Sequence, residues 1–127
     1  MVKYLIPFLW SSIILGMSFQ EKHIEDAILL GLKNNNSKAI VKHFGTTVSF
    51  FINGEDKILN KFQVEKVLSD FLQNNKVRTV EMAPHSKKGQ ANKYSLYTVK
   101  TNKDNYQVVV KFMEIKGEAT VVEFKVD

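Results

Sequence analysis

The side chains that most often bind metals or transfer protons are few and scattered in this chain. It holds three histidines, His23, His43 and His85, and no cysteine. No two histidines have the short spacing of a metal-binding pair such as His-Glu-x-x-His. The absence of cysteine excludes disulfides, thiolate metal sites and cysteine nucleophiles. We therefore predict no metal site and no cofactor, and we expect the histidines at helix ends and in a loop.

Acidic side chains in predicted strands are the next candidates, because a buried carboxylate can act as a general base. Glu81 and Glu123 alternate with apolar neighbours and are expected to face outward. Glu114 has inward parity but lies at the end of a strand, near water. Asp56 follows a turn, where a carboxylate is ordinarily structural. Because the pattern offers no pair of buried carboxylates, we assign no catalytic residue.

Aromatic residues on the inward side of the expected strands form a candidate binding pocket. A buried tyrosine brings a hydroxyl that requires a hydrogen-bond partner, and two tyrosines fall on this side. The candidate pocket comprises Phe50, Met82, Tyr94, Tyr106 and Phe112. Its expected occupant is a small apolar ligand. The alternative, which we favour, is that these side chains only fill the core between the sheet and the helices.

The composition is typical of one globular domain. The 127 residues are 44% hydrophobic, which suffices for one core and is too apolar for a disordered chain. The net charge is +5, but the basic residues are scattered lysines apart from Arg78. Lysine lacks the guanidinium fork that recognises phosphates and bases, so we expect no nucleic-acid partner. A basic loop with Lys87, Lys88 and Lys93 is expected to be solvated, with an anionic lipid or acidic partner as the alternative.

Residues 1–18 have the pattern of a signal peptide. A basic residue precedes an apolar stretch from Tyr4 to Leu15, which is short for a membrane span. Gly16 and Ser18 are the small residues that cleavage after Ser18 requires. We predict that this segment directs export and is removed, which leaves residues 19–127 as one periplasmic or extracellular domain without a stable membrane anchor. An uncleaved anchor is the alternative.

Three helices are predicted from apolar residues at three- and four-residue spacing. The first covers Ile24 to Leu32, with acidic residues in its first turn and an asparagine run at its end. Ser37 is expected to cap a short second helix that Gly45 closes. Asn60 and Gln63 have the spacing of a capping box and begin the third helix. Its apolar stripe comprises Val64, Val67, Leu68, Phe71 and Leu72.

The rest of the chain alternates polar and apolar residues with the period of two that strands have. One strand, 46–52, precedes the third helix and ends at Asn53-Gly54, the typical signal of a hairpin turn. Four more strands are expected at 77–83, 93–101, 106–115 and 120–126. Their short connections predict an antiparallel meander whose inner face is covered by the helices. In the last strand we expect the inward residues to be Val122, Phe124 and Val126.

This order of elements resembles the nuclear transport factor 2-like superfamily, which has a cystatin-like cone of class α+β. The chain is still more similar to a family of small secreted bacterial proteins known only as a domain of unknown function. The residues that carry the resemblance are Asp26-Ala27-Ile28, Asn36-Ser37-Lys38-Ala39, His43-Phe44, Lys61 to Phe71, Lys93-Tyr94 and Val121-Val122-Glu123-Phe124. The resemblance covers about Ile24 to Val126. It implies N-terminal helices packed on a curved antiparallel sheet, in the order α-α-β-α-β-β-β-β.

The superfamily includes isomerases, dehydratases, transport-factor scaffolds and noncatalytic ligand binders, so the fold alone does not give the function. Without a predicted buried acid pair, we expect a noncatalytic module of the cell envelope. Its partner would be a small apolar ligand in the cone or another envelope protein. The alternative is an isomerase- or dehydratase-like enzyme that uses the cone pocket. The resemblance also implies a homodimer through the outer sheet face, by which superfamily members often associate.

Overall fold

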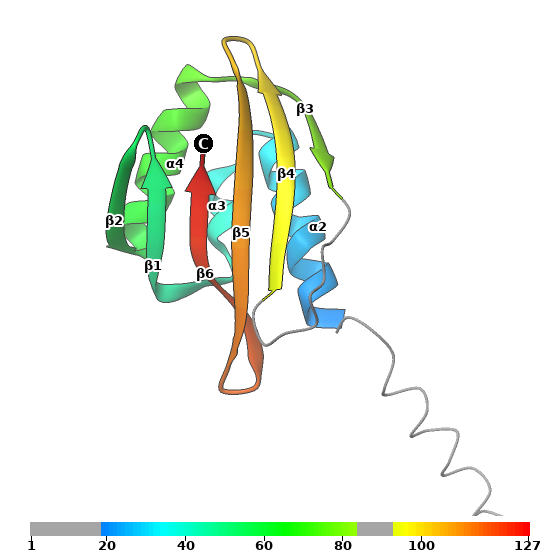
Figure 1. Ribbon diagram of the computed structural model, residues 1–127, viewed down its shortest axis with the longest axis vertical. Coiled ribbons are helices and arrows are strands. Elements are labelled where there is room, and N and C mark those ends of the chain that lie inside the picture. The colour runs from blue at the N-terminus through cyan, green and yellow to red at the C-terminus, as the bar shows by residue number, and fades with distance from the viewer. Residues whose placement is uncertain (1–18, 84–92) are drawn as a thin grey trace, which may run out of the picture.

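Three helices lie on one face of a six-stranded sheet (Figure 1) in the computed structural model, which describes residues 19–83 and 93–127. The helices are α2 (Phe19–Lys33), α3 (Ser37–Val41) and α4 (Lys61–Asn74). The strands are β1 (Phe44–Ile52), β2 (Glu55–Asn60), β3 (Val77–Met82), β4 (Lys93–Thr101), β5 (Asn105–Ile115) and β6 (Glu118–Val126). Within those two ranges, no helix is both long enough and apolar enough to cross a membrane.

The sheet is mixed, and its strand order is β2-β1-β6-β5-β4-β3. Strands β3 to β6 form the predicted antiparallel meander. The last strand, β6, then pairs in parallel with β1, which joins the first and last strands within one sheet. The predicted α+β cone, with helices on one face of the sheet, is confirmed.

The predicted order of elements lacks one strand. Residues Glu55–Asn60 form β2, an antiparallel partner of β1, where the sequence indicated only a hairpin or bend. The turn between them is as predicted, since Asn53 and Gly54 have φ values of 54° and 79°. Strand β2 escaped detection because it lies at the sheet edge and its side chains are almost all exposed. Backbone pairing with β1 defines it, with little hydrophobic periodicity in its own sequence.

Helix capping matches the sequence for α4 and differs for α3. Asn60 accepts a hydrogen bond of 2.8 Å from the Gln63 amide, and the Gln63 side chain accepts one of 2.9 Å from the Asn60 amide. This is the predicted capping box. The cap of α3 is Asn36, one residue before the predicted Ser37. Gly45 lies inside β1 and does not close α3, because the strand already begins one residue earlier.

A bulge shifts the inward face of β6. Lys111 pairs with Glu123 and Phe112 pairs with Val121, so Val122 is an extra residue in the ladder. Val121 is fully buried, whereas Val122 is only half-buried. The prediction that Val122 faces inward is therefore wrong, because a bulge interrupts the alternation of inward and outward side chains along a strand.

The hydrophobic core lies between the sheet and the three helices. Its side chains come from every helix and from every strand except β2. The fully buried ones are the largest contributors: Tyr97, Phe50, Phe124, Ile28, Ile40, Leu68, Val48, Val64, Val99, Val110 and Val121. Gly31 is where α2 meets α3 most closely, since a Cβ there would lie 2.7 Å from Ile40 Cγ1. The predicted single core is thus continuous from α2 to β6.

Candidate functional site

Four of the five predicted pocket residues take part in core packing. Phe50 is 1% exposed and Phe112 is 2% exposed, and the Phe50 ring stacks on Phe124. Met82 and Tyr106 are half-buried and pack against the same core. These contacts match the alternative of a filled core. The binding of a small apolar ligand by these residues stays a prediction.

Tyr94, the fifth predicted pocket residue, lies on the outer face of the sheet. Its side chain is 50% exposed, and Lys111 Nζ lies 5.8 Å from the ring centroid. The neighbours Ser95 and Tyr97 are buried instead. The prediction that Tyr94 faces inward is wrong. The predicted register of β4 differs from the observed one by one residue, and such a shift moves each side chain of a strand to the opposite face of the sheet.

The inward residues of β4 form a buried polar cluster with α2. The Ser95 hydroxyl donates to Glu25 Oε2, and the Tyr97 hydroxyl donates to the Glu25 backbone carbonyl at 3.0 Å. All three residues are at most 3% exposed. Burial, followed by the nearby Glu25 charge, raises the pKa of the Tyr97 hydroxyl, so Tyr97 stays neutral. One turn earlier, Glu21 accepts a 3.0 Å ion-pair contact from Lys93 at the start of β4.

Sequence reasoning missed Glu25, although a signal was present. With about 100° per residue in an α-helix, Glu25 falls about 20° from Leu32 on one side and about 40° from Leu29 on the other, inside the apolar arc of the helix. As an acid of the first turn, Glu25 is predicted only to interact favourably with the N-terminus of the helix. Its partner Ser95 was not predicted to be buried either, because the predicted register of this strand differs from the observed one by one residue.

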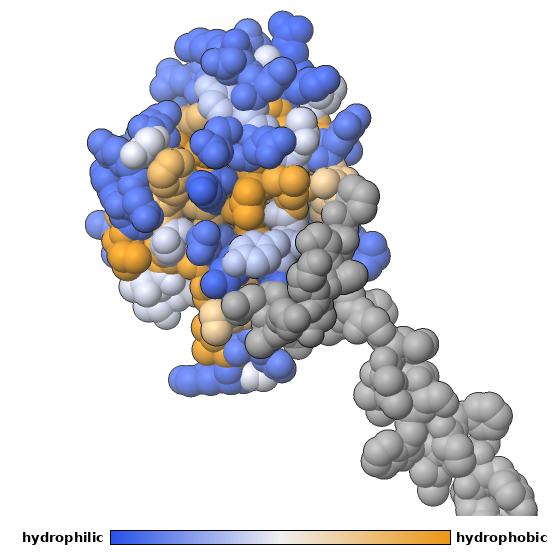
Figure 2. All heavy atoms as spheres, viewed as in Figure 1, coloured by the Kyte–Doolittle hydropathy of each residue, from blue (hydrophilic) through white to orange (hydrophobic). Residues whose placement is uncertain are grey.

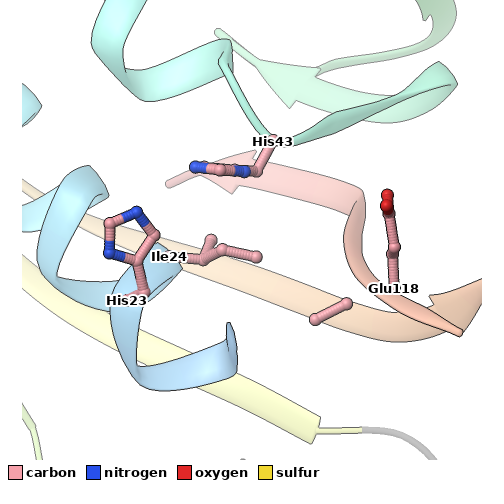
Figure 3. A pocket seen from close by; sticks show the side chains of 5 residues that line it. His23, Ile24, His43 and Glu118 are labelled. Atoms are coloured by element: carbon pink, nitrogen blue, oxygen red, sulfur yellow. The ribbon is translucent and has the colours of Figure 1, made fainter. Parts of the chain in front are cut away.

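The described residues also form a surface pocket that brings two histidines together. It has a volume of about 250 Å³ and is lined by His23, Ile24, His43, Glu118 and Ala119. His23 comes from α2, His43 immediately precedes β1, and Glu118 begins β6. The two imidazole centroids are 5.5 Å apart in an edge-to-face arrangement. Figure 3 shows the two rings extending toward each other across the pocket, with the Glu118 carboxylate on the far side of His43.

The surroundings of His43 favour its neutral form by lowering its pKa. Desolvation is the main cause of its lowered pKa, and the nearby His23, Lys42 and Lys61 lower the pKa further. Glu118 acts in the opposite direction. The Nε2 atom of His43 is buried and makes no hydrogen bond within the part of the chain that the structure describes. His43 lines the pocket, and a neutral imidazole has one nitrogen that can accept a hydrogen bond or bind a metal.

We expect His43 to make the protein less stable in mild acid. Its pKa is lowered from the ordinary 6.5 in the folded chain, so below about pH 6.5 the unfolded chain binds more protons. The free energy of unfolding should therefore decrease as the pH falls from that value toward the folded-state pKa. Urea denaturation at neutral and mildly acidic pH measures this. The variant His43→Gln should show a weaker pH dependence, and an unchanged dependence would contradict the assignment.

The outer face of the sheet, away from the helices, carries an outer-face patch of Phe51, Tyr94, Leu96 and Val109. Leu96 and Val109 are opposite each other on β4 and β5 and are half-buried. Phe51 is also half-buried, and Lys125 Nζ lies 5.1 Å from its ring centroid. Figure 2 looks onto this face and shows apolar residues in its middle, with hydrophilic residues around them.

Several predicted features lie outside the described residues. These are the signal peptide at 1–18 and the part of the basic loop that contains His85, Lys87 and Lys88. Lys93 is described and begins β4. Across the two described ranges, no three histidine, aspartate or glutamate side chains converge into a metal site.

Comparison with solved structures identifies the fold. A DUF4783 family protein from Bacteroides fragilis has 18% identity and a TM-score of 0.73, covering 80% of this chain and 94% of that chain. A second, from Bacteroides uniformis, has 19% identity and a TM-score of 0.74, with coverages of 80% and 94%. An NTF2-like protein of unknown function from Cytophaga hutchinsonii has 12% identity and a TM-score of 0.61, with coverages of 89% and 93%. No curated protein matches the chain in sequence.

These likenesses bear out the resemblance to the nuclear transport factor 2-like superfamily, and at such identities they show the fold alone. The family itself is shown by sequence. The model of one family matches residues 25–127, which is most of the chain. This protein belongs to that family, described as "Domain of unknown function (DUF4783)".

Proposed function

We propose that this protein is a noncatalytic binding module of the bacterial cell envelope. In this proposal the chain is exported and works as a pair of identical chains joined through the outer-face patch. The observation that carries the proposal is the contrast between the two faces of the sheet. The side chains of the inner face are buried in the core, whereas the outer face keeps apolar side chains in contact with solvent.

The filled interior argues against a ligand inside the cone. Phe50 and Phe112 are buried against other side chains, and Tyr94 lies on the opposite face of the sheet. A binding function is therefore better supported at the surface. The outer-face patch has the composition expected there, with aromatic and aliphatic side chains flanked by long cationic ones.

A second copy of the chain fits the patch by charge. Lys111 on β5 and Glu123 on β6 are direct cross-strand neighbours next to Tyr94. A two-fold axis through this region would place Lys111 of one chain opposite Glu123 of the other, and the reverse. Symmetric dimers require such a self-complementary surface. The apolar residues Leu96 and Val109, in the neighbouring rows of the sheet, would then be buried within the contact.

Charge exchange tests the dimer. We expect the wild-type protein to have the mass of a dimer in light scattering. Lys111→Glu and Glu123→Lys should each weaken the dimer, since each places like charges opposite one another. The double variant restores opposite charges across the axis and should restore the dimer.

The double variant is also the control for folding, because it carries both substitutions. A monomeric wild type at high concentration would contradict the proposal. The same conclusion would follow if the double variant dimerised as weakly as either single variant.

The exported location is the second part of the proposal and rests on the signal pattern of residues 1–18. Trp10 is the only tryptophan of the chain and lies in that segment. Protein recovered from the envelope should therefore lack tryptophan fluorescence and have the mass of residues 19–127. An intact N-terminus would contradict cleavage.

One observation favours an enzyme as the second candidate function. Glu25 is a carboxylate that is 3% exposed and lies between α2 and β4, beside the hydroxyl groups of Ser95 and Tyr97. An isomerase- or dehydratase-like enzyme would need such an acid facing a cavity. Against this candidate, both hydroxyls already donate to Glu25, and Glu25 does not line the histidine pocket. The noncatalytic module therefore remains the better-supported function.

A further inference from the structure

The pair His23 and His43 takes no part in the outer-face contact and is not needed to fill the core. His23 is exposed on α2, and His43 is half-buried before β1. The buried Nε2 of His43 has no hydrogen-bond partner within the described ranges. Buried polar atoms in folded proteins are nearly always paired with protein, water or an ion. Because His43 also lines the pocket, the unpaired atom points to a bound species.

The separation of the two rings fits a shared metal ion. Their centroids are 5.5 Å apart, and their planes are inclined by 80°. With zinc–nitrogen bonds of about 2.0–2.1 Å and a tetrahedral angle, two imidazoles bound to one ion have centroids about 5 Å apart. Figure 3 shows that each ring has a nitrogen on the side that faces the other ring. Small side-chain rotations would bring both nitrogens onto one ion.

We propose that His23 and His43 together bind one divalent transition-metal ion of the kind that imidazole prefers, such as Zn²⁺ or Cu²⁺. This proposal replaces the sequence-based expectation of no metal site. That expectation rested on spacing along the chain, and these two histidines become neighbours only when α2 packs on α3, the helix that leads to His43 and β1.

The proposed site has two protein ligands and an open side. Because no three suitable side chains converge among the described residues, water or a bound molecule must complete the coordination. Glu118 borders the pocket and adds a negative charge, whereas Lys42 and Lys61 oppose the positive charge of the ion. An open site near two lysines is expected to bind metal exchangeably, unlike a four-ligand structural zinc site.

Calorimetric titration with zinc chloride alone tests the site. The purified protein, freed of any affinity tag, is used near neutral pH in a buffer that does not bind metals. We expect one zinc ion per chain. His23→Ala should weaken binding by roughly tenfold or more, since half of the protein ligands are lost. Because His23 is exposed, this variant should fold like the wild type.

Two further variants are matched controls. His85→Ala removes the remaining histidine of the chain and should leave zinc binding unchanged. Glu123→Lys should also bind zinc like the wild type, because both ligands belong to one chain. This second control separates the metal site from the proposed dimer.

Three results would overturn the proposal. They are no zinc uptake by the wild type up to millimolar zinc, equal affinity of His23→Ala and wild type, and loss of binding in His85→Ala. In an NMR titration, zinc should shift the ring resonances of His23 and His43 together. A shift in the resonances of only one of the two rings would also contradict a shared ion.

Discussion

Replacing Leu68 by alanine is expected to lower the free energy of unfolding by about 2–5 kcal/mol. Leu68 lies in the middle of α4, is 1% exposed and belongs to the core cluster. Truncation removes buried methyl groups and leaves a cavity between the helix and the sheet. Because domains of this kind have about 5–15 kcal/mol of stability in total, the loss should be plain in a urea denaturation curve.

Two phenylalanines on the same helix provide the controls. Phe62 is 76% exposed, so Phe62→Ala should change the denaturation midpoint little. Phe71 is half-buried, and its ring meets Tyr106 edge to face with centroids 5.1 Å apart. The loss of stability caused by Phe71→Ala should therefore lie between the losses caused by Leu68→Ala and Phe62→Ala. It should be smaller than the loss expected for a fully buried aromatic residue. Equal midpoints for Leu68→Ala and Phe62→Ala would show that α4 does not pack by this face.

Replacing Tyr97 by alanine is the second substitution with a large expected effect, about 3–5 kcal/mol. Tyr97 is fully buried, and its hydroxyl reaches the backbone of α2. The variant Tyr97→Phe separates the two contributions, because it keeps the ring and removes only the hydrogen bond. We expect Tyr97→Phe to cost about 0.5–1.5 kcal/mol, the usual net value of one hydrogen bond. Chemical denaturation of both variants measures the difference.

The outcome for Tyr97→Phe also bears on the enzymatic alternative. A packed, structural cluster predicts lower stability when the hydroxyl is removed, since the hydrogen bond between β4 and the Glu25 carbonyl of α2 is lost. Unchanged or increased stability would contradict this structural role. It would be the pattern expected of a polar group held at the expense of stability for function.

The sequence by itself determined the elements whose signals are local. The capping box of Asn60 and Gln63 depends on residues three positions apart, so it could be predicted without tertiary information. The turn at Asn53-Gly54 depends on backbone conformations that these two residues adopt readily. The antiparallel meander followed from strand periodicity and short connections. The outward position of Glu81 followed from alternation with its neighbours.

Only the tertiary structure decided features that depend on pairing between distant segments. The bulge at Val122 and the register of Tyr94 are set by neighbouring strands, and a slip of one residue exchanges the two faces. Strand β2 is defined by its pairing with β1.

The candidate sites belong to this second group as well. Glu25 becomes a buried acid only because Ser95 and Tyr97 lie against α2. His23 and His43 meet because α2 packs on α3, which spacing along the chain does not encode. Local preferences therefore fix helices and turns, while burial and side-chain proximity arise from packing of the whole chain.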